Sequence, residues 1–200
     1  MTVAETSIRQ GEILDAALAL AFEGGPARVT TVAIAERLGL TQPAIYRHFR
    51  SKADIWAAIT DRLGAEVAAN ISEAEAEPGP ALARLRRLML GHLELIRRTP
   101  ALPEIMLVRD PNSADAVVRL TMQTRMATFQ KALLTFCTQA QAEGDLRADI
   151  DPRDMAALIA GVLQSLVLRL MLGRNPAVLL DDGTRLLNLQ LAAFARQSEA

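Results

Sequence analysis

Cysteine, histidine and aromatic residues are scarce in this chain of 200 residues. Cys137 is the single cysteine, so an intrachain disulfide is excluded. The two histidines, His48 and His92, lie far apart, and no Cys and His spacing typical of a metal site is present. A glycine motif that cradles phosphate and the nucleophile elbow of hydrolases are also missing. We therefore expect no enzyme activity and no cofactor.

Runs of β-branched residues are equally rare, whereas Ala, Leu and Arg dominate. Half of the residues are hydrophobic, so the chain can bury a sizeable core. Because Ala and Leu are strong helix formers, the composition predicts an all-α protein. Helical spacing of apolar residues predicts about nine helices, at 7–23, 31–38, 41–49, 51–71, 81–99, 101–108, 113–142, 152–173 and 182–196.

The net charge of −1 argues weakly against nucleic-acid binding, because DNA-binding domains are often basic. The relevant charge is local, however. Residues 1–60 carry six basic and six acidic side chains. Three of the basic ones, Arg47, Arg50 and Lys52, fall within six residues beside His48. Positive charge is thus concentrated in one short segment.

Residues 155–172 are apolar enough to approach the length of a membrane span. Gln164, Ser165 and Arg169 interrupt the second half, and an arginine is costly inside lipid. A helix that is apolar all round can instead be buried on both sides. The first residues also lack the pattern of a signal peptide. We expect a cytoplasmic protein with no membrane contact.

Residues 30–49 read as two short helices joined by a tight turn at Gly39, a residue type suited to left-handed backbone. Their expected inner faces are apolar: Ile34, Ala35 and Leu38 in the first helix, and Leu40, Ile45 and Phe49 in the second. Thr41 is expected to cap the second helix. Ser51 and Asp54 form a capping-box pattern at the start of the next helix. The segment has the pattern of a helix-turn-helix.

The outer side of the second helix is polar, aromatic and basic, and the helix is thin enough for a major groove. It carries Gln42, Ala44, Tyr46, Arg47 and His48. Gln42 can bond an adenine through two atoms, and Ala44 can touch a thymine methyl. Tyr46 and His48 suit phosphate oxygens. Lys52, beside helix N-terminal amides, and Thr31, at the start of the preceding helix, can bind phosphate as well.

This segment closely resembles the TetR family of bacterial repressors. The matching residues read TTxxIAxxLGL from residue 30, QPAIYRHF from residue 42 and SKxDI from residue 51. The resemblance implies an N-terminal DNA-binding domain and a C-terminal domain for ligand binding and dimerisation. It also implies DNA-contacting positions at Thr31, Gln42, Pro43, Tyr46, His48 and Lys52. Val32 departs from the pattern, because some members carry a basic residue there.

The expected division is a helix-turn-helix domain at 1–52 and a regulatory and dimerisation domain at 53–200. A homodimer would place two recognition helices in successive major grooves of a palindromic operator in double-stranded DNA. The last two expected helices can form a four-helix bundle across a two-fold axis. The residues assigned to this interface are Leu158, Val162, Leu166, Leu170, Leu187, Leu191 and Phe194. The alternative is that they fill the core of one protomer.

A small apolar or amphipathic effector is the expected ligand of the C-terminal domain. Adaptable Met-rich walls suit such a molecule. The candidate pocket residues are His92, Met106, Met122, Met126, Phe129 and Gln164. Ordinary core packing is the alternative for each of them. The family resemblance favours a repressor that the effector releases from its operator.

Three other functions remain open at this stage. A DNA-binding accessory factor would keep the same head but respond to a protein partner or to no small molecule. A helical interaction module would bind no DNA, and a small helical enzyme would need a catalytic motif that we do not find.

Overall fold

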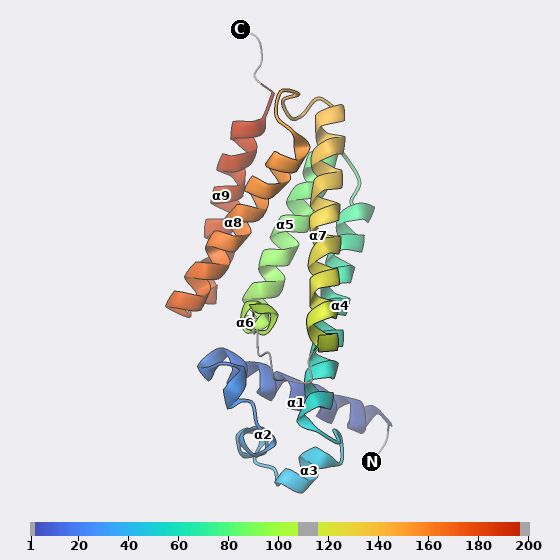
Figure 1. The fold of residues 1–200 in the computed structure, drawn as a ribbon, viewed down its shortest axis with the longest axis vertical. Coiled ribbons are helices and arrows are strands. Elements are labelled where there is room, and N and C mark those ends of the chain that lie inside the picture. Colours follow the sequence, from blue (N-terminus) through green and yellow to red (C-terminus); the bar gives the residue numbers. More distant parts are fainter. Residues whose placement is uncertain (1–2, 108–115, 197–200) are drawn as a thin grey trace. The chain divides into compact units, whose positions relative to one another are not determined.

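The computed structural model describes the backbone of residues 3–107 and 116–196, and the side chains of residues 6–103, 105 and 124–196. The described backbone is helical apart from turns, loops and one isolated bridge between Leu146 and Ala195 (Figure 1). The predicted all-α class is confirmed. The helices are α1 (Val3–Gly24), α2 (Thr31–Leu38), α3 (Gln42–Tyr46), α4 (Lys52–Ala76), α5 (Ala81–Arg98), α6 (Leu102–Leu107), α7 (Ala116–Ala142), α8 (Pro152–Gly173) and α9 (Leu179–Phe194), with short 3₁₀ turns at Pro26–Arg28 and Pro176–Val178.

Several helix ends differ from their predicted positions: α1 begins at Val3 instead of near residue 7, and α9 spans Leu179–Phe194 instead of residues 182–196. α4 continues to Ala76 instead of ending near residue 71. Residues 72–76 lack apolar periodicity, but Ala and Glu favour helix, and the first residue that forbids it is Pro78. α3 is shorter than predicted and ends at Tyr46, where the chain tightens into a turn with the His48 N–H bonded to the Ile45 carbonyl.

The chain divides into two compact units. The first consists of Met1–Gly64 and Thr99–Met122, and the second of Ala65–Arg98 and Gln123–Ala200. α4 begins in the first unit and ends in the second. The division of function between 1–52 and 53–200 stays a prediction.

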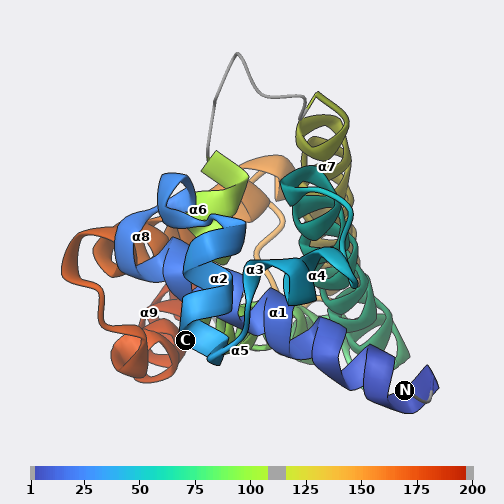
Figure 2. The same cartoon turned by 90° about the horizontal axis from the view of Figure 1, so that it is seen from below.

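In the first unit, α1 packs against α2, and α2 packs against α3 (Figure 2). Ile13, Ile34, Ile45 and Ile59 are fully buried and contribute one isoleucine each from α1, α2, α3 and α4. These four side chains give the short α2 and α3 a common core, which neither helix could provide alone.

In the second unit, α5 packs against α9, and α9 packs against α8 (Figure 1). Close approach depends on two helical glycines. A Cβ at Gly183 of α9 would lie 2.3 Å from Leu93 of α5, and a Cβ at Gly91 of α5 would lie 1.8 Å from Asn70 of α4. Glycine at these positions therefore lets the helix backbones come close enough to bury Leu93 and Asn70.

Five of the seven residues predicted for the dimer interface fill the core of one protomer, which is the alternative that the sequence left open. Leu166, Leu170, Leu187, Leu191 and Phe194 are buried inside the second unit of a single chain. The spacing of these residues identified an apolar face, but it could not tell which surface covers that face.

Other apolar residues of α8 and α9 remain uncovered. Leu158 is more than half exposed, and Val162 is half-buried. Leu168, Leu172 and Leu189, which are not among the predicted interface residues, are each more than half exposed. Among the described residues, α8 is the one helix long and apolar enough to cross a membrane, although only 33% of its apolar window is buried. α8 therefore has one covered and one uncovered apolar face.

Candidate nucleic-acid interface

The turn between α2 and α3 is fixed by backbone hydrogen bonds around Gly39. This residue has φ 64°, a left-handed conformation that glycine adopts without strain. Its N–H points to the Ala35 and Glu36 carbonyls, and the Leu40 N–H bonds the Ala35 carbonyl over 2.9 Å. The predicted turn at Gly39 is confirmed, and it sets the direction in which α3 leaves α2.

The two helices begin differently. Thr30 precedes α2, and its hydroxyl accepts a hydrogen bond of 3.0 Å from the Ala33 N–H, which satisfies one free amide of the first turn. Thr41 occupies the equivalent position before α3 but makes no side-chain cap, so the predicted cap is not formed. Pro43 lies in the first turn of α3, where its missing N–H breaks no helical bond.

α3 has a buried and an exposed side, as predicted. Ile45 is fully buried and Phe49 is buried just beyond the helix. Gln42, Pro43 and Arg47 are exposed, and 48% of Tyr46 is accessible. Ala44 and His48 are half-buried, and the Nδ1 atom of His48 is buried without a hydrogen-bond partner among the described residues. The exposed residues form one polar and aromatic surface, which we call the recognition face.

Thr31 lies differently from the other predicted contacts. Only 8% of the residue is accessible, and its hydroxyl accepts a 2.9 Å hydrogen bond from Nε2 of Gln42. Both residues are predicted DNA contacts, but the local sequence pattern does not predict this bond between them. They stand eleven positions apart on two helices, so the pairing depends on the tertiary turn.

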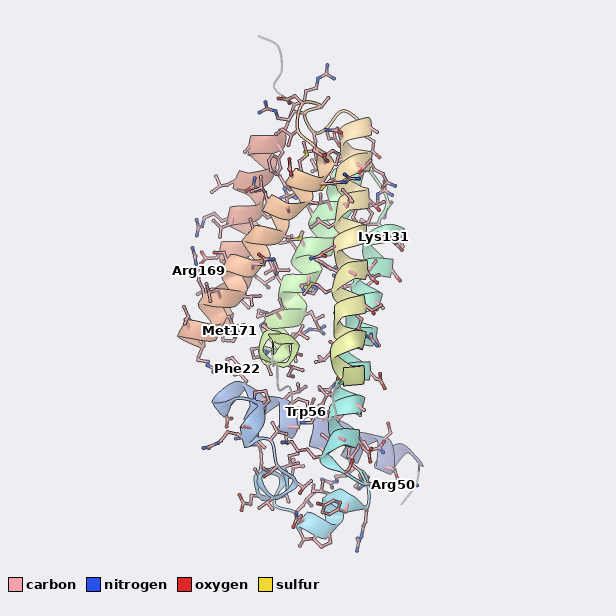
Figure 3. The ribbon with its side chains drawn as sticks, in the orientation of Figure 1. Phe22, Arg50, Trp56, Lys131, Arg169 and Met171 are labelled. Carbon is pink, nitrogen blue, oxygen red and sulfur yellow. The ribbon has the colours of Figure 1, made fainter. Side chains whose placement is uncertain are left out.

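Positive charge next to the recognition face is unpaired. Arg47, Arg50 and Lys52 are exposed and form no ion pair among the described residues. Figure 3 labels Arg50. Arg37 of α2 is different, because it donates hydrogen bonds to the Glu23 carboxylate of α1 through both terminal nitrogens of its guanidinium group. These hydrogen bonds lower the pKa of the Glu23 carboxyl and raise the pKa of Arg37. The exposed cations that follow α3 are thus available to an external anion, whereas Arg37 is not.

Lys52 is the first residue of α4. The Ser51 hydroxyl accepts a 3.1 Å hydrogen bond from the Asp54 N–H, which confirms Ser51 as the cap of this helix. An exposed lysine beside the free amides of a helix N-terminus is a suitable binding site for a phosphate oxygen. The recognition face and the start of α4 thus expose both amide and cationic groups, which have the chemistry to contact bases and phosphates.

The predicted effector residues are only partly brought together. His92 of α5 is buried, and its ring centroid lies 4.4 Å from that of Phe129 of α7. Met126 is 37% accessible and Gln164 is exposed, which does not place Gln164 in a buried pocket. The side chains of Met106 and Met122 lie outside the described residues.

Burial lowers the pKa of His92 to about 4. The imidazole is therefore neutral at physiological pH, and its Nδ1 atom has no hydrogen-bond partner among the described residues. His92 and Phe129 together form a buried aromatic pair with one unsatisfied polar atom.

A short helix whose exposed side carries Gln42, Tyr46 and Arg47, and whose other side is anchored by Ile45, defines a helix-turn-helix DNA-binding protein. Comparison with known proteins identifies its family. Residues 13–59 match the bacterial regulatory proteins of the TetR family, and residues 107–181 match the tetracycline-repressor-like C-terminal domain. The chain belongs to the TetR family. It is a DNA-binding transcriptional regulator and not an enzyme.

Similar proteins cover most of the chain. The HTH-type transcriptional regulator TtgR of Pseudomonas putida is 29% identical over 90% of this chain and 89% of its own. The nucleoid occlusion factor SlmA of Marinobacter nauticus is 30% identical over 74% of each chain. The solved structure of the ketosteroid transcriptional regulator KstR2 of Mycobacterium tuberculosis has a TM-score of 0.80 at 20% identity, over 94% of this chain and 96% of that one.

Proposed function

We propose that this protein is a cytoplasmic repressor that binds a palindromic operator as a homodimer and is released by a small-molecule effector. The observation that carries the proposal is the recognition face. Its polar residues are exposed on α3, while Ile45 and Phe49 hold the helix from behind. A face buried against the rest of the chain could not enter a major groove.

The contacts divide into two groups. Gln42 reads an adenine, and Ala44 and Pro43 lie against the bases as apolar contacts. Tyr46, Arg47, His48 and Lys52 bind phosphates and fix the register of the helix on the duplex. Only the first group carries sequence preference, so the two groups differ in what their loss does to binding.

The two lysines of the chain provide the first test. Lys52 and Lys131 are both exposed. Lys52 is the first residue of α4, and Lys131 lies on α7, where Figure 3 labels it. The bound sequence is first selected from random DNA, where a palindrome is expected. Lys52→Ala should then weaken binding to all sequences about equally and lower the salt slope by about 1. Lys131→Ala is the matched control and should change neither. Equal effects of the two substitutions would contradict the phosphate contact.

Exposed leucines on α8 and α9 support the homodimer. Leu158, Leu168, Leu172 and Leu189 are each more than half exposed. Burying an exposed leucine side chain is favourable by about 1.5–3 kcal/mol. Association with a second copy that covers these residues is therefore favourable. An uncovered face of this kind in a family of transcriptional regulators is best explained by a partner subunit and not by a membrane.

Leu189→Glu tests the dimer. At a protein concentration where the wild type sediments as a dimer, this variant should sediment as a monomer, because a carboxylate would be buried at the interface. Ile8→Glu is the control, since Ile8 is 65% accessible and Leu189 is 61% accessible. The control should remain dimeric. Dissociation of both variants, or of neither, would count against the α8 and α9 interface.

The effector site is proposed around His92 and Phe129. A neutral imidazole with an unsatisfied nitrogen can exchange one hydrogen bond with a ligand, and the aromatic ring beside it favours an apolar body. The ligand class is therefore a neutral apolar or amphipathic molecule with one polar group. A compound that releases the operator from the wild type should release it less well from His92→Leu, while both proteins bind DNA equally in its absence.

The similarity to SlmA favours one alternative, a DNA-binding accessory factor controlled by a protein partner. Mapping bound sites across the chromosome separates the two functions. Bound sites that are confined to promoters support a repressor, provided that transcripts from those promoters rise when the gene for this protein is deleted. Scattered sites without a transcriptional response support the accessory factor.

A further inference from the structure

The hydrogen bond between Gln42 and Thr31 links an exposed residue to a fixed one. The donor, Nε2 of Gln42, belongs to the recognition face, while the accepting hydroxyl belongs to a residue that is only 8% accessible. Gln42 is the first residue of α3 and Thr31 is the first residue of α2. The bond therefore joins the beginnings of the two helices across the turn.

Thr31 is a rigid anchor for this bond. The residue before it caps α2, and the Ile34 N–H bonds the Thr30 carbonyl over 2.9 Å. Branching at Cβ further restricts the χ1 angle of a threonine. Glutamine is long and flexible, and the final torsion of its amide is broad and roughly two-fold. Of the two side chains, Thr31 positions Gln42 and not the reverse.

We propose that Thr31 is a positioning residue for base readout, which holds the Gln42 amide in the orientation that reads adenine. With Nε2 bonded to Thr31, the amide oxygen lies on the opposite side of the group and can accept a hydrogen bond from a base. The second hydrogen of Nε2 remains to be donated. Adenine offers an N6 amine and an N7 acceptor next to each other in the major groove, which matches this pair of atoms. The proposal rests on the proposed function, because it requires Gln42 to reach a base edge.

Guanine is the base that this orientation rejects. It presents the O6 acceptor where adenine presents its N6 amine, so O6 would face the amide oxygen of Gln42. With the bond in place, the same half rotation would require the Thr31 hydroxyl to donate to the amide oxygen instead of accepting from Nε2. An amide without the bond turns freely and can offer Nε2 to O6. The Thr31 hydroxyl thus raises the preference for adenine over guanine, although Thr31 itself touches no base.

This role differs from the direct phosphate contact that the family resemblance implies for Thr31. A phosphate contact contributes equally to all sequences and depends on salt. A positioning role changes the preference at one base pair and acts only while Gln42 is present. The two roles therefore separate in a mutant cycle.

The experiment uses the full-length protein. Selection from random DNA with the wild type and with Gln42→Ala first identifies the base pair whose preference depends on Gln42. Affinities are then measured for operators with adenine or guanine at that position, at two salt concentrations. The variants are Thr31→Val, which keeps the shape but removes the hydroxyl, and Thr31→Ser, which keeps the hydroxyl. Each is made with Gln42 and with Gln42→Ala, and helix content and thermal unfolding are recorded for all.

The wild type should prefer adenine. Thr31→Val should reduce the ratio of adenine to guanine affinity about fivefold, as expected for the loss of one net hydrogen bond. Thr31→Ser should keep the ratio, and Thr31→Val should have no further effect when Gln42 is already alanine.

Several results would overturn the proposal. A wild-type preference for guanine would mean that the amide is turned the other way. Equal weakening on both operators, with a smaller salt slope and the same effect in Gln42→Ala, would make Thr31 a phosphate contact. If a folded Thr31→Val protein kept the wild-type ratio of adenine to guanine affinity, Thr31 would have no role in positioning Gln42. Failure of the wild type to select any DNA would instead overturn the proposed function itself.

Discussion

Substitution of Gly91 by alanine tests how closely α4 and α5 pack. The added Cβ would lie 1.8 Å from Oδ1 of Asn70 and 2.7 Å from a guanidinium nitrogen of Arg87. Arg87 is half-buried and can move its end, but Asn70 is buried and donates a 3.0 Å hydrogen bond to the Leu88 carbonyl. Relief of the clash therefore requires Asn70 to leave its site and lose that bond.

The expected change follows from three contributions. Forcing an extra methyl into a packed interior costs about 1–3 kcal/mol. A buried amide that loses its partner costs about 1–3 kcal/mol. Alanine is a better helix former than glycine by about 1 kcal/mol, which acts in the opposite direction. Gly91→Ala should thus lower the free energy of unfolding by about 3 kcal/mol, and the Tm by roughly 6–12 °C for a chain of this size.

Urea and thermal unfolding at one fixed protein concentration measure this change. Gly11→Ala is the matched control, because Gly11 lies inside α1 and nothing approaches its added Cβ within 4 Å. The control should be at least as stable as the wild type. Asn70→Ala combined with Gly91→Ala should be more stable than the sum of the two single changes implies, since the clash is removed. Simple additivity, or a Gly91→Ala protein as stable as the wild type, would refute the packing argument.

Three further predictions concern other parts of the chain. The pKa of His92 is lowered to about 4 from an ordinary value of 6.5 by burial, so the unfolded chain takes up the proton first as pH falls. The stability contributed by the neutral imidazole is full above pH 6.5 and is lost towards pH 4. The wild type should therefore lose about 2 kcal/mol more unfolding free energy than His92→Gln between pH 7 and pH 5, measured by urea titration. Thr30→Ala should lower the free energy of unfolding by about 1 kcal/mol through loss of the α2 cap, whereas Thr30→Ser should not; an equal loss in both would point to a cause other than the hydroxyl. Burial also raises the pKa of the Cys137 thiol to about 12, so a thiol reagent at pH 8 should label it only after unfolding; rapid labelling of the native protein would contradict its burial.

The helix-turn-helix could be predicted because its signals are local. Gly39 marks the turn, and the spacing of Ile34, Ile45 and Phe49 separates the buried from the exposed side. Each of these signals lies within a few residues of the structure it specifies. The exposed positions of Gln42 and Arg47 follow from the same periodicity.

The contacts between distant segments could not be predicted in this way. The bond between Thr31 and Gln42 exists only once the turn has folded. Leu166 and Leu191 have the spacing of an interface, yet they are buried within one chain, because periodicity identifies an apolar face without its partner. The exposed Leu189 could have been noticed as an apolar residue outside the buried stripe of α9. The close packing of Asn70 against Gly91 joins two different helices, so the spacing of residues within either helix does not predict it.

The scarcity of lysine has a practical consequence. The chain has side-chain amines only at Lys52 and Lys131, which are both exposed, one at the start of α4 and one on α7. An amine-reactive reagent therefore reports on both sites in a single sample, with Lys131 as the internal reference for Lys52. Because Lys52 is the proposed phosphate contact, its reactivity relative to Lys131 lets occupancy of the duplex be followed by mass spectrometry without introducing any label.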